Sequence, residues 1–430
     1  MKKKLNIAII GLGQIGNYLL NEINIKKKDI ELKTGKNITI SAISAKNINK
    51  KRKYKINKKI FFKNPLEIFK KKNIDILIEA IGNSDGISKK IVVEALKRKI
   101  HVITPNKALI SKHGDYLSKL AEKNKVNLEF EASVGGGIPI LRTLKDGLAT
   151  NKFNKVVGIL NGTSNYILSE MEKRKQTLPI ILKQAQRLGY AEPINPKLDL
   201  NGYDALSKIK ILSSLSFNKK ISKSKCLMEG IENIDLKDIK LANQLNLRIK
   251  LLGITEIIHN KLFERVHPCL VGKDTYLGNI DGVMNAVILN SKPVGETVLQ
   301  GEGAGAGPTS SALMSDLLSI LRGNIKYPFG IPSSKRNTIK SYDINNYSNS
   351  LYLRFEVKDR PGVLSEITSR LAKNKISVKR IIQTPSNKNK IATIVIITHK
   401  TSEKNSNTCL RIFRKNKNII KKPTLIRLFN

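Results

Sequence analysis

The chain has 430 residues, a formal net charge of +44 from 78 basic and 34 acidic side chains, and 40% hydrophobic residues. This length predicts two or three domains, and the hydrophobic content excludes wholesale disorder. Its three cysteines lack CxxC spacing, which excludes a disulfide scaffold and a cysteine-based zinc site. No apolar run approaches the roughly 20 residues of a membrane span, which excludes a membrane protein. We therefore expect a reducing, cytoplasmic location.

The positive charge is spread along the whole chain. Lysine, asparagine and isoleucine recur throughout, as in proteins encoded by AT-rich genomes, and no basic block is interleaved with aromatic residues in the manner of single-strand binders. We expect weak binding of polyanions at low salt but no specific nucleic-acid partner.

Short apolar runs alternate with amphipathic stretches over residues 1–140. The apolar runs are typical of buried parallel strands, and the amphipathic stretches of helices that cross over between them. This alternation predicts an α/β fold with a doubly wound parallel sheet of the Rossmann type. The expected strands are residues 5–10, 38–43, 74–80, 101–104 and 127–131, and the expected helices are residues 15–25, 88–99 and 109–123.

Beyond residue 140 the pattern changes, and residues 141–332 are predicted to form an α+β domain. A helix at residues 309–322, capped by Thr309 or Ser310, is expected to pack back on the first domain. Residues 333–349 are polar and predict a linker, after which residues 350–430 form a third domain. The other elements expected in the second domain are helices at residues 163–175, 178–188, 203–215 and 237–247, and strands at residues 249–257, 262–269 and 285–289.

A glycine loop follows the first expected strand and opens a helix. Glycines there permit a tight turn and the close approach of a pyrophosphate, while the helix N-terminus supplies amide donors. The loop therefore predicts a dinucleotide site. Its residues are Gly11, Leu12, Gly13, Gln14, Ile15 and Gly16, and we expect the three glycines with Gln14 and Ile15 to bind the cofactor.

The end of the second expected strand carries no carboxylate that would grip the ribose hydroxyls of NAD. Residues 43–47 instead include Lys46, and residues 50–52 are Lys-Lys-Arg. Cations at this place suit a 2′-phosphate. We therefore expect Lys46 to contact the cofactor and NADP to be preferred, with NAD as the alternative.

Six further blocks follow one another along the chain. They are Thr104-Pro-Asn-Lys107-Ala-Leu109, Glu131-Ala-Ser-Val134-Gly-Gly136-Gly-Ile138-Pro139, Gly158-Ile-Leu-Asn161-Gly-Thr-Ser-Asn165-Tyr166, Leu188-Gly189-Tyr-Ala-Glu192-Pro193, Asp199-Leu-Asn-Gly-Tyr-Asp204-Ala-Leu-Ser-Lys208 and Gly303-Ala-Gly305-Ala-Gly-Pro-Thr309. In this order and spacing, residues 5–330 resemble homoserine dehydrogenase. The resemblance implies NAD(P)-dependent interconversion of L-homoserine and L-aspartate 4-semialdehyde in threonine, methionine and isoleucine biosynthesis. It also implies a homodimer or homotetramer assembled through the second domain.

The resemblance makes Lys208 the acid/base at the substrate oxygen and Asp204 a substrate-binding carboxylate. It brings Lys107 into the same site, near both nicotinamide and substrate. Asp204 and Lys208 are four residues apart on an expected helix and share one face, as a plain surface ion pair would. A lysine acts as a base near neutral pH when its pKa is lowered, and partial burial beside a second cation such as Lys107 would lower it.

The resemblance also matches Glu192 to a position that binds both substrate and cofactor. Gly189, Gly303 and Gly305 are matched to the neighbourhood of the cofactor, the last two in a loop that closes over the nicotinamide. A monovalent-cation site, generally for Na⁺, is implied with ligands that are mainly backbone carbonyls, which suit a hard cation. The residues matched to it are Glu131, Val134, Gly136 and Ile138.

Two positions depart from the family pattern. In the loop at residues 192–196, Asn195 stands where an acid is usual, and the spacing to Lys208 grows by one residue. Pro105 replaces a common alanine, which fixes φ and removes an amide donor. Neither change deletes a proposed catalytic group.

The last segment begins with residues 351–357, which alternate like a half-buried strand. The turn Asp359-Arg-Pro-Gly362 follows, then an expected helix at residues 365–374 and strands at 376–378 and 391–398. This order resembles a ferredoxin-like ACT domain. The resemblance implies threonine feedback with Asp359 and Gly362 near the effector; the alternative is a module that only mediates assembly.

Two other functions fit the same frame. One is a related NADP oxidoreductase that acts on another small polar alcohol. The other is a relict dehydrogenase that serves as an amino-acid sensor, which predicts the loss of catalytic groups. Lys107, Asp204 and Lys208 are nevertheless all present.

Overall fold

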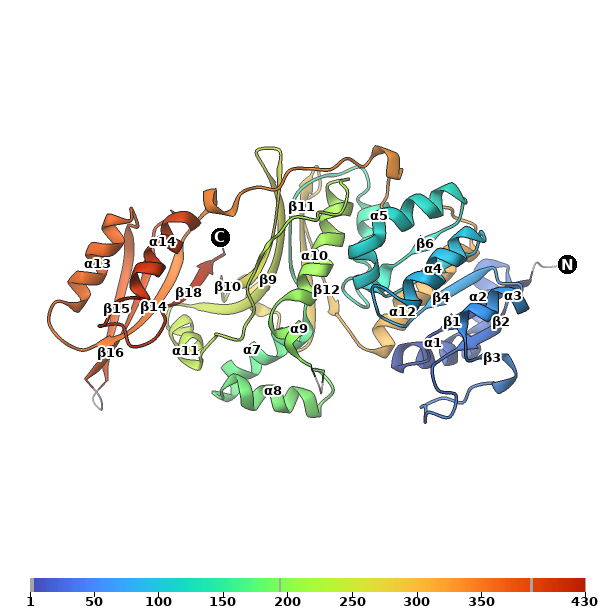
Figure 1. Ribbon diagram of the computed structural model, residues 1–430, viewed down its shortest axis with the longest axis horizontal. Helices are drawn as coiled ribbons and strands as arrows, with labels where there is room; N and C mark the ends of the chain where they lie inside the picture. The colour runs from blue at the N-terminus through green and yellow to red at the C-terminus, as the bar shows by residue number, and fades with distance from the viewer. Residues whose placement is uncertain (1–3, 193–194, 387–389, 430) are drawn as a thin grey trace.

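The structure is a computed structural model that describes residues 4–192, 195–386 and 390–429. Its parts follow one another along an elongated molecule (Figure 1). The N-terminal domain lies at one end, a tall sheet with helices on one side stands in the middle, and the C-terminal domain lies at the other end.

The N-terminal domain is a six-stranded parallel sheet in the order β3-β2-β1-β4-β5-β6. The chain starts in the middle, runs to one edge and returns to build the other, so the order reverses between β1 and β4. Ligands of doubly wound sheets bind at this reversal. The elements are β1 (Lys4–Ile10), α1 (Gln14–Ile25), α2 (Lys27–Thr34), β2 (Asn37–Ser44), β3 (Phe61–Phe62), α3 (Ile68–Lys71), β4 (Ile76–Glu79), α4 (Ile87–Lys97), β5 (His101–Ile103), α5 (Lys107–Lys123) and β6 (Leu128–Glu129).

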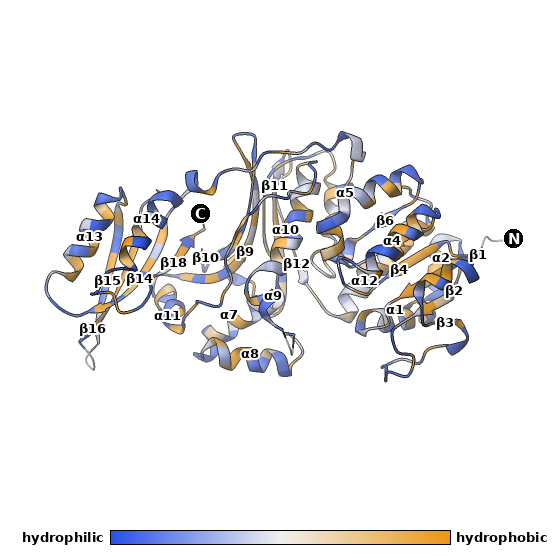
Figure 2. Ribbon diagram, in the orientation of Figure 1, coloured by the Kyte–Doolittle hydropathy of each residue, from blue (hydrophilic) through white to orange (hydrophobic). Residues whose placement is uncertain are grey.

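Apolar runs form these strands because helices cover both faces of the sheet and leave no solvated side. Residues 7–10 of β1 have at most 1% of their surface exposed. Figure 2 shows the central strands as hydrophobic ribbons between helices whose outer surfaces are more hydrophilic. Strands of four or more residues were therefore predictable from their apolar runs, whereas the two-residue β3 and the short charged α2 were not.

The central domain holds most of a second sheet, in the order β12-β11-β7-β9-β10, with α10 packed against β7, β9 and β10. Helix α10 carries Lys208, one of the two predicted catalytic lysines, and the predicted substrate-binding Asp204. The elements are α6 (Ile140–Arg142), β7 (Lys152–Ile159), α7 (Gly162–Arg174), α8 (Leu178–Arg187), α9 (Lys197–Leu200), α10 (Tyr203–Ser216), β8 (Leu227–Met228), α11 (Leu236–Gln244), β9 (Leu247–Ile258), β10 (Lys261–Gly272), β11 (Met284–Lys292), β12 (Gly295–Glu302) and α12 (Ala306–Leu321).

Three expectations for this domain were wrong. Helix α12 was expected to begin at a cap formed by Thr309 or Ser310, but it begins at Ala306 after Gly305, and no side chain caps it. The predicted helix at residues 237–247 ends at Gln244, because Asn246 turns the chain with φ of +59° and β9 begins one residue later. The strands β7 and β12 were not expected at all. Strand β7 mixes lysine and asparagine with valine, and its pairing with β9 and β11 decides its conformation.

Helix α12 returns to the N-terminal domain and packs against α1. Leu313 and Leu317 are fully buried in one hydrophobic cluster with Leu19 of α1 and Ile9 of β1. The N-terminal domain is thus completed by a helix almost 300 residues after its first strand.

The C-terminal domain extends the central sheet instead of forming a separate one. Strand β18 pairs with β14 on one side and in parallel with β10 on the other. Two ion pairs reinforce the junction. Arg354 of β14 and Asp238 of α11 form a buried pair at 2.6 Å, and buried Arg427 of β18 lies 2.7 Å from the partly exposed Glu229. The elements are β13 (Ser348–Asn349), β14 (Leu351–Lys358), α13 (Val363–Lys373), β15 (Val378–Ser386), β16 (Ile391–Thr398), β17 (Thr401–Ser402), α14 (Glu403–Phe413) and β18 (Thr424–Leu428).

The strand expected at residues 376–378 was placed too early, since β15 starts at Val378 and runs on to Ser386. Helix α14 and strand β18 were missed. Helix α14 buries Glu403, Ser406 and Cys409 together with Phe413, so it lacks the apolar periodicity that signals a helix. The predicted fold class is confirmed: a parallel Rossmann-type sheet, a mixed central sheet and an ACT-like C-terminal domain.

Candidate active site

Two lysines converge on one carboxylate between the first two domains. Lys107 is the first residue of α5, and Asp204 and Lys208 lie one turn apart on α10. Lys107 Nζ is 2.8 Å from Asp204 Oδ1, and Lys208 Nζ is 2.9 Å from Asp204 Oδ2. Lys208 Nζ also donates to the Leu160 carbonyl oxygen at 2.6 Å. The structure thus brings together the three residues that the sequence placed in one site.

The two lysines differ in burial and in the direction of their pKa shifts. The Lys208 side chain is 9% exposed and that of Lys107 is 41% exposed. Burial lowers the pKa of Lys208; Asp204 opposes this shift and the charge of Lys107 adds to it. Asp204 raises the pKa of Lys107. Burial would raise the pKa of Asp204, but the two lysines outweigh it and hold that pKa below its ordinary value. Lys208 is therefore the lysine suited to exchange a proton, while Lys107 stays a cation.

Two polar residues that were not proposed as site residues support Asp204. The Asn161 side-chain amide donates to Asp204 Oδ2 at 2.9 Å and to Asp199 Oδ1 at 2.8 Å. The Asn161 side-chain oxygen accepts from the Ser164 amide and so caps α7. Burial raises the pKa of Asp199, which Asn161 then lowers in part. Both residues lie inside the sequence blocks quoted above, so their position there was the available signal.

Glu79 at the end of β4 holds the start of α5 in place. Its carboxylate is fully buried and accepts hydrogen bonds from Ser88 Oγ at 2.8 Å, Thr104 Oγ1 at 2.6 Å and the Asn106 amide at 3.4 Å. Asn106 in turn caps α5 by accepting from the Leu109 amide at 3.0 Å. Because Lys107 follows Asn106 directly, this network determines where the lysine enters the site. The sequence offered no signal for Glu79 apart from its place at a strand end.

Gly189 and Glu192 lie in the loop that follows α8. Gly189 has φ of +76°, and a Cβ there would meet no atom within 4 Å, so its backbone conformation and not its packing favours glycine. Glu192 is exposed, and its charge adds to the effect of Asp204 in raising the pKa of Lys107. The altered loop is described only at Asn195 and Pro196, since residues 193 and 194 lie outside the described residues.

The glycine loop has the conformation that a dinucleotide requires. A Cβ on Gly11 would lie 2.5 Å from the Ala80 carbonyl oxygen, and a Cβ on Gly16 would overlap the Gly11 carbonyl. These two glycines are needed for packing of the loop. A Cβ on Gly13 would meet nothing within 4 Å, and no side chain caps the N-terminus of α1, which begins at Gln14. The open face at Gly13 and the free amides of α1, including that of Ile15, suit a pyrophosphate.

The basic segment after β2 is stabilised by hydrogen bonds from the side chain of Arg52, one of its own cations. Arg52 donates to the carbonyl oxygens of Asn47 at 2.6 Å, Lys50 at 2.9 Å and Leu12 in the glycine loop at 3.2 Å. Its guanidinium therefore shapes the segment. Lys46 is exposed at the end of β2 and keeps its ammonium group at the surface. Lys50 and Lys51 of the same segment are exposed as well, and Lys46 is the lysine that lies nearest in sequence to the end of β2.

The second glycine-rich loop contacts the segment predicted to bind a cation. A Cβ on Gly136 would lie 2.5 Å from the carbonyl carbon of Gly303, and Gly137 N donates to the Glu302 carbonyl oxygen at 3.1 Å. Gly303 packs so closely on the Asn285 side chain that a Cβ would overlap it. Gly305 has φ of +114° directly before α12. The structure thus joins the loop of Gly303 and Gly305 to residues 135–137.

The backbone at residues 131–138 has two carbonyl oxygens that lack a hydrogen-bond donor among the described residues. Gly135 and Gly136 both have positive φ, and no described residue donates a hydrogen bond to the carbonyl oxygens of Val134 and Gly136. The Glu131 carboxylate accepts from the amides of Leu141 and Arg142, both at 2.8 Å, so its side chain holds α6. The other two predicted ligands differ, because the Glu131 carbonyl oxygen accepts from the Val134 amide at 3.3 Å and the Ile138 carbonyl oxygen accepts from the Ile140 amide at 2.8 Å. No group of three or more His, Cys, Asp or Glu suited to a metal occurs in the described part of the chain.

A glycine loop open to a pyrophosphate at the switch point of a parallel sheet is the arrangement of a dinucleotide-binding protein. The cluster of Lys107, Asp204 and Lys208 adds acid–base groups of the kind that NAD(P)-dependent oxidoreductases use. Three family models match: "Homoserine dehydrogenase, NAD binding domain" at residues 11–131, "Homoserine dehydrogenase" at residues 139–318 and "ACT domain" at residues 351–416. The chain belongs to the homoserine dehydrogenase family.

Similar proteins match the chain over most or all of its length. A homoserine dehydrogenase of Neisseria gonorrhoeae is 38% identical over 99% of both chains. The crystal structure of a homoserine dehydrogenase from Thiobacillus denitrificans is 33% identical, with a TM-score of 0.91 over 100% of this chain and 99% of that one. A hyperthermophilic archaeal homoserine dehydrogenase in complex with NADPH is 25% identical, with a TM-score of 0.61 over 74% of this chain and 97% of its own. Within the described ranges, no helix has the length and apolar character needed to cross a bilayer.

Proposed function

We propose that the chain interconverts L-homoserine and L-aspartate 4-semialdehyde with NADP and that Lys208 carries the proton. The observation that supports this assignment is the ion-pair cluster in which buried Lys208 and half-exposed Lys107 share Asp204. The cluster lies at the carboxyl ends of the parallel strands, where α5 begins and packs against α10, as oxidation of an alcohol beside a dinucleotide requires.

Each residue of the cluster has its own part in this reaction. The nicotinamide, when bound, accepts or delivers the hydride. Lys208 as a free amine takes the hydroxyl proton during oxidation and returns it during reduction. Lys107 remains protonated and stabilises negative charge on the substrate oxygen. Asp204 binds substrate and keeps the two amines in place, and Glu192 offers a carboxylate to the amino group of homoserine.

The preference for NADP rests on Lys46 and is supported by the archaeal relative, which binds NADPH. We expect Lys46→Ala to lower the ratio of kcat/KM with NADP to kcat/KM with NAD by about tenfold, because the variant loses one charge-assisted contact to the 2′-phosphate. The ratio is measured from absorbance at 340 nm with L-homoserine. Lys373→Ala removes an exposed lysine from the C-terminal domain and should leave the ratio unchanged. An unchanged ratio in Lys46→Ala would show that another residue contacts the 2′-phosphate of NADP.

A monovalent cation, Na⁺, is proposed at the backbone of Glu131, Val134, Gly136 and Ile138. The free carbonyls of Val134 and Gly136 are the supporting observation. Because residues 135–137 contact the loop of Gly303 and Gly305, a cation there would stiffen the loop next to the cofactor.

The C-terminal domain is proposed to bind threonine as a feedback effector. Gly362 has φ of +87° and opens α13, and Asp359 is exposed three residues earlier. We expect millimolar L-threonine to release heat in isothermal titration and to slow homoserine oxidation, and Asp359→Asn to weaken both effects. A wild-type protein that shows neither heat nor inhibition would leave the domain with a role in assembly, which we propose to be a homodimer or homotetramer.

A further inference from the structure

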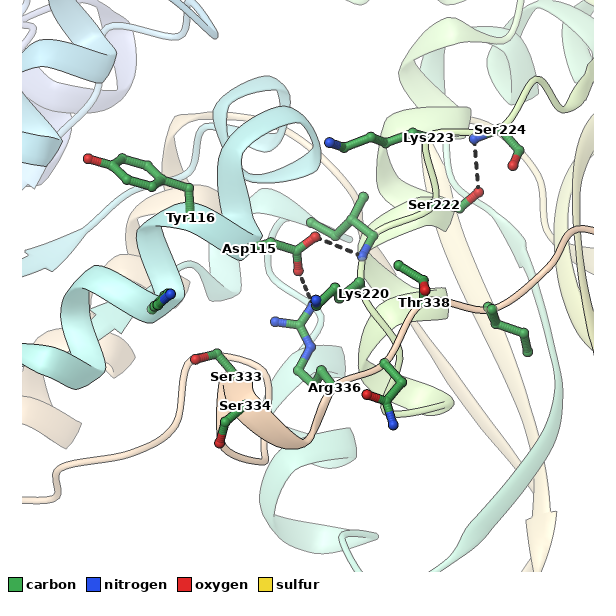
Figure 3. A pocket seen from close by; sticks show the side chains of 14 residues that line it. Asp115, Tyr116, Lys220, Ser222, Lys223, Ser224, Ser333, Ser334, Arg336 and Thr338 are labelled. Carbon is green, nitrogen blue, oxygen red and sulfur yellow. Dashed lines mark hydrogen bonds and ion pairs between the residues drawn. The ribbon is translucent and has the colours of Figure 1, made fainter.

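A cavity of about 720 Å³ lies where three distant segments meet, apart from the cluster of Lys107, Asp204 and Lys208. Its walls come from the second half of α5, from residues 220–224 after α10, and from residues 333–339, which lead to the C-terminal domain. Figure 3 shows Asp115 of α5 and Arg336 meeting across it, with Ser333 and Ser334 on one side and Ser222, Lys223 and Ser224 on the other.

The lining carries four cations and one carboxylate. Lys119, Lys220 and Lys223 are exposed lysines, whereas Arg336 is only 1% exposed. Asp115 is already engaged, because it accepts from Arg336 Nη2 at 2.6 Å and from the Ile221 amide at 3.1 Å. The cavity therefore has an excess of positive charge that no residue of its wall neutralises.

The Arg336 guanidinium is held in place by several contacts, and one of its nitrogen donors has no hydrogen-bond partner among the described residues. Its guanidinium stacks on the Phe329 ring at 3.9 Å and donates through Nη2 to Ser214 Oγ at 2.7 Å as well as to Asp115. Nη1 is buried and has no hydrogen-bond partner among the described residues. A buried guanidinium nitrogen without a partner loses free energy that an acceptor in the cavity would restore.

Hydroxyl groups complete the lining, from Ser224, Ser334 and Thr338, whereas the Ser222 hydroxyl is bound to the Glu264 carboxylate and to the Ser224 amide. The Ser333 hydroxyl already has a partner, because it donates to the carboxylate of Glu122, which does not line the cavity, at 2.7 Å. A fixed guanidinium, mobile ammonium groups and hydroxyls are the donors that bind phosphate oxygens. The volume exceeds that of a single inorganic ion and lies in the range of small-molecule sites.

We propose that this cavity binds the phosphate group of a small phosphate ester. Such a ligand contacts α5, which begins at Lys107, the segment that follows α10 with its Asp204 and Lys208, and the chain leading to the C-terminal domain. Its binding fixes these three parts relative to one another. The site is separate from the dehydrogenase reaction and would be present even if NADP were not the preferred cofactor.

The test uses the full chain with NADP at saturation, so that the cofactor site cannot contribute. Glycerol 3-phosphate is titrated calorimetrically into wild type and into Lys119→Gln/Lys220→Gln/Lys223→Gln, whose exposed side chains are replaceable without loss of the fold. We expect one site in wild type, an affinity lowered by about tenfold or more in the triple variant, and a rise in Tm on binding that only wild type shows.

The matched control, Lys70→Gln/Lys71→Gln/Lys72→Gln, removes the same charge from an exposed run at the end of α3. It should bind glycerol 3-phosphate as wild type does. Equal weakening in both triple variants would show that the overall charge attracts anions without a site, and would overturn the proposal. Absence of heat with wild type, or equally tight binding of citrate, would overturn the assignment to a phosphate ester.

Discussion

Lys208→Ala is expected to lower kcat for homoserine oxidation by about three orders of magnitude, the range that positioned acid–base groups contribute. The physical reason is that Lys208 is the buried amine whose pKa is lowered by burial and by Lys107, so it can take up the hydroxyl proton. The measurement is the reduction of NADP at 340 nm under saturating L-homoserine. Binding of NADP, followed separately by fluorescence, should persist in the variant.

Two further variants distinguish the loss of proton transfer from the loss of a positive charge. Lys208→Arg keeps the cation but cannot release a proton near neutral pH, so it should be nearly as slow as alanine. Lys210→Ala removes a neighbouring lysine of α10 and should remain active.

In wild type, the oxidation rate should rise with pH through a midpoint below 10.5, the ordinary lysine value from which burial lowers the pKa of Lys208. Substantial activity in Lys208→Arg would contradict the role as proton carrier.

Asp204→Asn is expected to raise KM for L-homoserine roughly 10- to 100-fold, because a charged hydrogen bond to substrate is lost. The variant should also move the pH midpoint of oxidation to lower pH. Asp204 raises the pKa of Lys208 in wild type, so its removal leaves burial and the charge of Lys107 to lower that pKa further. A pH profile of kcat together with KM measures both effects.

The control for Asp204 is Asp85→Asn. Asp85 also pairs with a lysine of α5, Lys112, at 2.7 Å, but it is half exposed and lies outside the cluster. Its replacement should change neither KM nor the pH midpoint. If Asp204→Asn raised KM without moving the midpoint, its carboxylate would bind substrate without influencing the lysine, and the electrostatic coupling proposed here would be wrong.

Local features of the chain could be predicted from the sequence alone. The apolar runs of β1 and β4 form buried strands wherever helices cover both faces, and the positions of Gly11 and Gly16 mark a turn that only glycine permits. Asp204 and Lys208 share a helix face because they are four residues apart. Each of these inferences depends on contacts between near neighbours in sequence, whose geometry the backbone itself dictates.

Long-range contacts needed the tertiary structure. The approach of Lys107 to Asp204 joins residues 97 positions apart and depends on the Glu79 network, which connects the end of β4 with Ser88 of α4 and with the segment of Thr104 and Asn106. Arg52 looked like a phosphate-binding cation, yet its donors are taken by backbone carbonyls of its own segment and of the glycine loop.

The sequence by itself determined the dinucleotide loop, the catalytic helix and the order of the three domains, because each is encoded in short motifs or in the periodicity of apolar residues. Only the tertiary structure decided that β18 pairs with β10 and that α12 returns to α1. It alone placed Arg336 opposite Asp115 in a basic cavity. These contacts join segments far apart in the chain, and their partners are selected by packing and burial in the folded protein, which no local pattern records.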